Sequence, residues 1–175
     1  MKFFNDQLVP DDLPLEDLER MLFSDHIQDF ALACEELALT RRRDAFALMR
    51  RCYAQADPFR RRSLLAVLLG CPFAGELSAE AEAALASGDP ELAAAALTAV
   101  AAGTVTVADA AILDSLAENA AELPAAAWQA LARVAPDPAH RGKLEALLSA
   151  APERVTPLLP GYLTAEARQT VDLPE

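Results

Sequence analysis

Apolar residues recur along most of this chain at intervals of three and four, the spacing that places them on one side of an α-helix. The clearest stripe follows Asp25, a preferred helix-capping residue, and consists of Ile27, Phe30, Ala31, Cys34, Leu37 and Ala38. Similar stripes between turn residues predict about eight to ten helices. We expect them at residues 15–22, 25–38, 43–56 (with a start at 43 or 44), 59–69, 78–86, 91–102, 109–116 (with a start at 106 or 109), 124–134, 138–148 and 164–171.

Three of the predicted helices begin on the same dipeptide, Asp-Pro, at positions 57–58, 89–90 and 137–138. Asp is a preferred N-cap because its carboxylate accepts hydrogen bonds from the first free N–H groups, and Pro is preferred at the next position. The first two copies lie 32 residues apart and the third follows 48 residues later. Recurrence of one helix-turn-helix signal along a chain is typical of repeat architectures.

This pattern resembles the HEAT-like and armadillo-like α-helical repeat family, in which a second helix often opens with Asp-Pro. The resemblance covers residues 25–151. It implies an all-α superhelix of stacked antiparallel hairpins in a single domain over residues 14–175, with an extended acidic lead-in at 1–13 and a proline-rich cap at 152–175. In that family an Arg commonly follows the Pro at three residues, as Arg61 and Arg141 do; the middle copy has Ala93. A compact bundle whose helices share a good cap is the alternative.

Composition supports helices packed closely together. Hydrophobic residues make up 53% of the chain but aromatic residues only 6%. Most apolar positions between Ala79 and Ala151 are alanine, the best helix former. Strand-forming residues cluster only at residues 104–107, which is too short a run to indicate a sheet.

The net charge of −12 disfavours binding to nucleic acid or to an anionic membrane. Residues 92–113 are long and weakly charged, but their Ala, Thr and Gly contribute too little transfer free energy for a membrane span. The N-terminus lacks the apolar core of a signal peptide. Cys34, Cys52 and Cys71 stand far apart with no metal-binding spacing, which indicates buried thiols in a reducing compartment, and we expect a cytoplasmic protein.

Positive charge is concentrated in one helix pair. Eight of the fifteen basic residues are arginines at positions 41, 42, 43, 50, 51, 60, 61 and 62. Arginine binds carboxylates and phosphates through two parallel hydrogen bonds, so the cluster predicts a recognition patch for an acidic partner. The residues proposed for the patch are Arg43, Arg50, Arg51, Arg60 and Arg61, with Tyr53 and Phe59 as an aromatic wall. The competing interpretation is that the acids of residues 25–36 neutralise these arginines.

The sequence therefore predicts a non-catalytic protein-protein interaction module whose partner is another protein or an acidic peptide. No catalytic, cofactor or metal motif is present, and His26 and His140 stand in no ligand pattern. The alternatives are a nucleic-acid-binding HEAT-like protein and a structural domain that binds no ligand. The pattern determines neither the partner's identity nor the oligomeric state.

Overall fold

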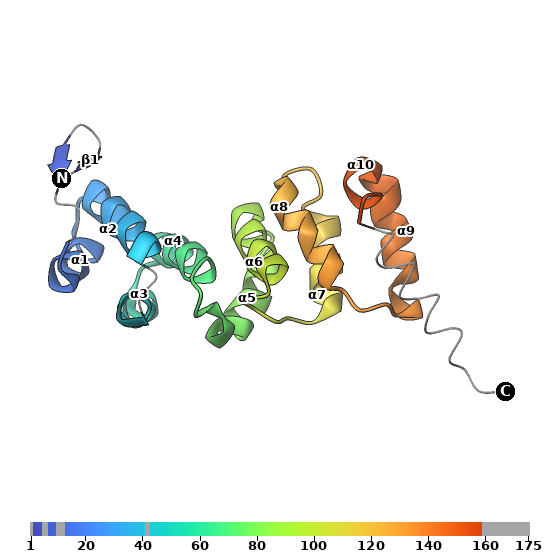
Figure 1. The fold of residues 1–175 in the computed structure, drawn as a ribbon, viewed down its shortest axis with the longest axis horizontal. Coiled ribbons are helices and arrows are strands. Elements are labelled where there is room, and N and C mark those ends of the chain that lie inside the picture. The colour runs from blue at the N-terminus through green and yellow to red at the C-terminus, as the bar shows by residue number, and fades with distance from the viewer. Residues whose placement is uncertain (1, 5–6, 10–12, 41–42, 159–175) are drawn as a thin grey trace. The chain divides into compact units, whose positions relative to one another are not determined.

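The structure, a computed structural model, describes the whole chain except residues 1, 5–6, 10–12, 41–42 and 159–175 (Figure 1). Helices dominate it, and about ten α-helices follow one another from Leu15 to Val155. An all-helical protein was the prediction, and the structure confirms it for this span. Among the described residues, no helix combines the length and the apolar character needed to cross a bilayer.

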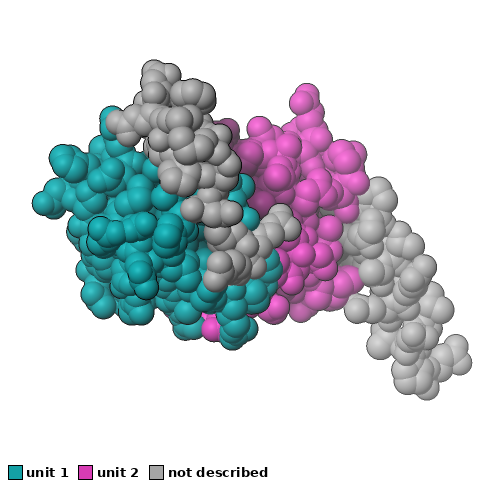
Figure 2. Space-filling view, turned by 60° about the vertical axis from the view of Figure 1, so that its left-hand side comes forward, with its two compact units in different colours: residues 1–73 teal, residues 74–175 magenta. Residues whose placement is uncertain are grey.

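The chain folds into two compact units, residues 1–73 and residues 74–175 (Figure 2). Each unit has its own buried core. The single domain expected over residues 14–175 stays a prediction. Residues 159–175, which include the predicted helix at 164–171, lie outside the described residues.

Unit 1 begins with a short antiparallel β-hairpin that the sequence pattern does not predict. Strand β1 (Lys2–Phe4) pairs with β2 (Gln7–Val9), with Phe3 opposite Leu8. Four helices follow: α1 (Leu15–Leu22), α2 (Ile27–Thr40), α3 (Arg43–Gln55) and α4 (Pro58–Leu69). Helix α1 packs on α2 and α3 packs on α4, and each pair also contacts the other through α1 with α3 and α2 with α4.

The buried face of α2 differs from the predicted stripe. Phe30, Cys34 and Leu37 are buried as expected, but Ile27 is 53% exposed and Ala31 and Ala38 are also exposed. The core takes Leu32, Ala33 and Glu36 instead. Helix α2 contacts α1, α3 and α4, so its buried surface is wider than one stripe and turned away from Ala31.

Unit 2 is a series of shorter helices. Its elements are the 3₁₀ helix η1 (Ala74–Leu77), α5 (Ser78–Leu85), α6 (Pro90–Ala102), α7 (Asp109–Glu118), α8 (Ala125–Trp128), η2 (Gln129–Arg133), η3 (Pro138–His140), α9 (Arg141–Ala150) and α10 (Pro152–Val155). The eighth predicted helix is thus one turn of α-helix continued as a 3₁₀ helix. Helix α5 packs on α6, α7 on η2, and α9 on α10. Contacts also join α5 to α7, α7 to α9, α6 to α8, and α8 to α10.

Alanine lets the elements of unit 2 approach closely. Ala93, Ala96 and Ala99 on α6 are at most 4% exposed, and α6 packs against α5, α8 and η2. Gly103 ends α6 with a positive φ of 74°, the left-handed conformation that glycine adopts without strain. Small side chains on one element therefore accommodate three neighbours.

The three Asp-Pro caps form as predicted. The Asp57 carboxylate accepts hydrogen bonds from the N–H groups of Phe59 and Arg60, and Asp89 accepts them from Glu91 and Leu92. Asp137 accepts one from Ala139 at the start of η3. In each case the proline occupies the first turn, as the capping geometry requires.

Candidate functional site: the arginines of helices α3 and α4

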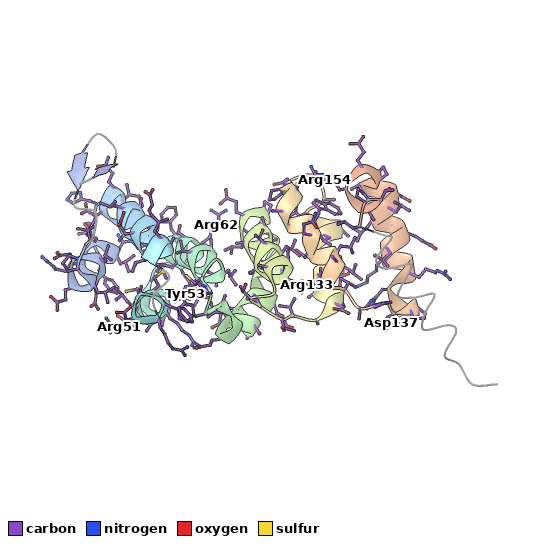
Figure 3. All side chains as sticks on the ribbon, viewed as in Figure 1. Arg51, Tyr53, Arg62, Arg133, Asp137 and Arg154 are labelled. Carbon is purple, nitrogen blue, oxygen red and sulfur yellow. The ribbon has the colours of Figure 1, made fainter. Side chains whose placement is uncertain are left out.

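The seven predicted patch residues lie on two helices of unit 1. Arg43, Arg50, Arg51 and Tyr53 belong to α3, and Phe59, Arg60 and Arg61 to α4. Arg41 and Arg42 lie outside the described residues. In the view of Figure 3, Arg51 and Arg62 lie on different sides of the α3–α4 pair.

Arg60, one of the predicted patch residues, makes several contacts within unit 1. Its guanidinium donates to the backbone carbonyls of Leu22 at 3.4 Å and Ser24 at 2.5 Å. It also lies over the ring of Phe30, 5.6 Å from the centroid, and pairs with the Asp57 carboxylate at 3.4 Å. With only 19% of its side chain exposed, Arg60 joins the start of α4 to the turn between α1 and α2.

Arg154 in unit 2 shares two kinds of contact with Arg60, a hydrogen bond to a backbone carbonyl and an aromatic ring. It donates to the carbonyl of Leu123 in the loop before α8 and lies over the ring of Trp128, 5.7 Å from the centroid (Figure 3). Both arginines are the third residue of a helix that begins with proline, and both aromatic rings belong to the fourth residue of the preceding even-numbered helix. We call this arrangement the turn clamp: Arg60 with Phe30 in unit 1, and Arg154 with Trp128 in unit 2.

The turn clamp does not use the arginine that follows the helix-opening proline at three residues. The arginine that reaches the preceding pair follows the proline by two residues, not three. Arg61 instead lies over its own hairpin partner, Tyr53. The signal that could have found the clamp is Pro-x-Arg at 58–60 and 152–154, together with an aromatic residue in the preceding helix.

Arg51 and Arg43 also have partners within unit 1. The Arg51 guanidinium donates to the Glu19 carboxylate on α1 at 2.5 Å, and Arg43 lies over the ring of Phe73, 5.5 Å from the centroid. Both members of the Arg51–Glu19 pair are partly exposed, so water screens the attraction. The competing interpretation predicts that acids within residues 25–36 neutralise these arginines. Asp29, one of them, accepts a hydrogen bond from the Ser24 hydroxyl at 2.7 Å.

Arg61 differs from these arginines. It is exposed, and its guanidinium lies 5.7 Å from the centroid of the half-buried Tyr53 ring. Among the residues that the structure describes, none forms an ion pair or side-chain hydrogen bond with it. A guanidinium that lies over an aromatic face does not use its N–H groups in that contact. These donors stay available for a carboxylate.

The three cysteines offer no reactive thiol. All are buried. Burial, with a smaller contribution from Cys52, raises the pKa of Cys34 to about 12, and burial, with a smaller contribution from Glu19, raises the pKa of Cys52 to about 11. Burial raises the pKa of Cys71 as well. The protonated thiol is the unreactive form. Within the described ranges, no three His, Cys, Asp or Glu side chains come together as a metal site.

Comparison of the chain with protein-family models, with curated proteins and with solved structures gave no match in any of the three.

Proposed function

We propose that this chain is a HEAT-like helical-repeat module that binds an acidic segment of another protein. The repeat part of the proposal is supported by the contacts within each unit. Within unit 1, α1 packs on α2 and α3 on α4, while α1 also contacts α3 and α2 also contacts α4; in unit 2, α5 packs on α6 and also contacts α7, and α7 in turn contacts α9. Stacked hairpins bury their apolar faces against one another in this way, because a single pair is too narrow to bury its own.

Repeated polar contacts add support. The turn clamp occurs once in each unit, on helices that open with Pro-x-Arg. In unit 2, the Glu82 carboxylate of α5 accepts from the N–H of Ala108 at 3.2 Å, and the Asp109 carboxylate of α7 accepts from the N–H of Ala135 at 2.9 Å. Each acceptor lies 26 residues before its donor, so the carboxylates of α5 and α7 each bind the loop that leads from their own helix pair to the next one.

The binding part of the proposal rests on Arg61. Other arginines of the cluster stabilise unit 1: Arg60 through the turn clamp and Arg51 through Glu19. Arg61 is exposed, is held by Tyr53 and has no carboxylate partner among the described residues. An arginine oriented by an aromatic ring is a common anchor at protein interfaces. Arg61 is therefore the centre of the proposed patch, with Tyr53 and Phe59 beside it.

The test is binding of a fluorescently labelled glutamate-rich peptide, measured by anisotropy at low salt. The variant Arg61→Glu should bind at least about tenfold more weakly and should keep the thermal stability of the wild type. Arg141→Glu is the matched control, because Arg141 is also an exposed arginine and lies in unit 2.

If Arg61→Glu and Arg141→Glu weaken peptide binding equally, the loss of affinity comes from net charge alone and the proposal is overturned. Absence of any peptide binding by the wild type would also overturn it. If Arg61→Glu lowers thermal stability, Arg61 stabilises the folded protein instead of binding a partner. A duplex DNA probe that binds at about 50 mM salt more tightly than the peptide would favour the nucleic-acid alternative.

A further inference from the structure

Helix α3 presents a regular stripe of arginine and alanine to the solvent. Arg43, Ala47, Arg50 and Ala54 are all exposed, and they follow one another at intervals of four, three and four residues. Residues at these intervals lie on one side of an α-helix, because seven residues complete about two turns. We call these four residues the arginine stripe. It carries two arginines about 10 Å apart along the helix axis, with a small side chain after each.

Arg51, the residue next to Arg50, lies outside the arginine stripe. One step along an α-helix turns the side chain by about 100° around the axis. This turn directs Arg51 to α1, where its guanidinium lies 2.5 Å from the Glu19 carboxylate. Two adjacent arginines of α3 therefore lie on different sides of the helix.

Two aromatic rings beside the stripe are each covered by a guanidinium. Arg43 lies over Phe73, 5.5 Å from the centroid, and Arg61 of α4 lies over Tyr53, 5.7 Å from the centroid. Tyr53 follows Arg50 by three residues, so it lies about one turn further along α3 and about 60° around it. Arg61 therefore adds a positive charge beside the stripe, near its C-terminal end.

The spacing of the stripe matches that of a second α-helix. Residues seven apart in any α-helix lie on one side and about 10 Å apart. Carboxylates repeated at that interval would meet Arg43 and Arg50 together when two helices lie side by side, and each guanidinium can bind a carboxylate through two parallel hydrogen bonds. Alanine at positions 47 and 54 leaves room for the close approach of helix axes that such packing requires.

An extended segment matches the stripe less well. Its residues advance by about 3.3 Å each, so about three residues span the distance from Arg43 to Arg50. Side chains three residues apart in an extended chain point to opposite sides, so only one of the two would face α3. Charge complementarity at both arginines therefore favours a helical partner.

A second copy of this chain also fits poorly. A two-fold symmetric contact would place one arginine stripe against the other, so arginines would face arginines. Each copy also carries a net charge of −12, which opposes association at long range.

We infer that the arginine stripe of α3 binds an acidic α-helix of another protein, whose carboxylates repeat at seven-residue intervals along one side. This inference rests on the proposed function, which requires only an acidic segment. It adds the helical conformation of that segment and the spacing of its charges.

The experiment compares two labelled helical peptides of identical composition by fluorescence anisotropy at low salt. Both consist of alanine and glutamine with three glutamates. In the first peptide the glutamates stand seven residues apart and share one side of the helix. In the second they stand five residues apart, so successive glutamates point about 140° away from each other. Circular dichroism verifies that the two peptides are equally helical, and the first should bind at least about fivefold more tightly.

Arg50→Gln should remove the preference for the first peptide, because it deletes one of the two charges of the stripe. Arg51→Gln is the matched control: it removes the neighbouring arginine, which lies on the side of α1. This variant should keep the preference. An equal loss of preference in the two variants would overturn the inference, and the comparison of the two peptides on the wild-type protein tests it without any substitution.

Equal binding of the two peptides by the wild type, or binding of neither, would also overturn the inference. The proposed function would still stand in that case if the glutamate-rich peptide binds and Arg61→Glu weakens its binding. Insensitivity of the glutamate-rich peptide to Arg61→Glu would overturn the proposed function and, with it, the inference.

Discussion

The two units of this protein use the same connections between helices but very different side chains. Unit 1 carries ten basic and twelve acidic residues, a net charge of −2, whereas unit 2 carries five and fifteen, a net charge of −10. Unit 1 fills its core with large side chains such as Phe46 and Met49, and unit 2 with alanines such as Ala93 and Ala96. Nevertheless, one turn clamp occurs in each unit.

The difference teaches that helix pairing does not depend here on the size of the core side chains. Long helices with large side chains and short helices with alanine both contact the helix two places along. What the units share is local: a proline-opened helix, an arginine at its third residue and an aromatic ring in the preceding pair. Probes native to each unit can separate them, because all three cysteines lie in unit 1 and the single tryptophan lies in unit 2.

The largest expected effect is on the alanine core of unit 2. Ala96→Leu inserts a larger side chain at a fully buried position of α6 and should lower the free energy of unfolding by about 2 to 3 kcal/mol. Trp128 fluorescence during urea unfolding measures it. Ala83→Leu, at an exposed position of α5, should have little effect. An equally small effect at Ala96 would mean that the core of unit 2 can accommodate a leucine there. Its alanines would then not determine the distance between helices.

The next effect separates Arg60 from Arg61. Arg60→Ala removes hydrogen bonds from a guanidinium to two carbonyls and should lower the free energy of unfolding by about 1.5 kcal/mol. Urea-dependent labelling of the unit 1 cysteines measures it, and the Trp128 transition should move less. Arg61→Ala, which removes only the contact with Tyr53, should cost less than Arg60→Ala. Equal losses would contradict the division between a structural and a binding arginine.

A smaller and equal effect is expected at the two α-helix caps. Asp57→Ala in unit 1 and Asp89→Ala in unit 2 each remove two hydrogen bonds to N–H groups, at a cost of about 1 kcal/mol. Cysteine labelling reports the first and Trp128 fluorescence the second. A cost confined to one unit would show that the shared Asp-Pro signal has different roles in the two units.

The last expected effect is a pH dependence in unit 1, seen only above the ordinary pKa of a thiol. The pKa values of Cys34 and Cys52 rise from the ordinary 9.0 to about 12 and about 11, so the unfolded chain loses these protons before the folded one does. Stability from these thiols is complete below pH 9 and falls as the pH rises from 9 towards 11. Urea midpoints followed by far-ultraviolet circular dichroism should fall over this range, and less so in the double variant Cys34→Ala with Cys52→Ala. A fall of equal size in that variant would assign the effect to other groups.

The sequence predicted the helices and their starts well because those signals are local. An Asp-Pro cap requires only a carboxylate, a proline and the N–H groups that follow, so Asp57, Asp89 and Asp137 behave as expected. The face of α2 was predicted less well, because three neighbouring helices decide what is buried, and they leave Ile27 and Ala31 exposed. The β-hairpin was missed because six residues carry too little pattern to be distinguished from a loop.

The candidate site could be predicted only as a concentration of charge. Composition identified the arginines of α3 and α4, but it could not tell which of them have partners. Arg51 meets Glu19, 32 residues earlier, and Arg60 meets carbonyls 36 and 38 residues earlier. Residues so far apart in sequence come together only when the helices pack. Arg61 was distinguished from Arg60 by the direction in which each leaves α4.

The sequence by itself determined an all-helical chain, the Asp-Pro caps and the uneven distribution of arginine, because each depends on residues within a few positions of one another. The tertiary structure decided which arginines stabilise unit 1, which apolar side chains stay exposed and where the turn clamps form. Those outcomes depend on contacts between helices, whose side chains meet only after the chain has folded.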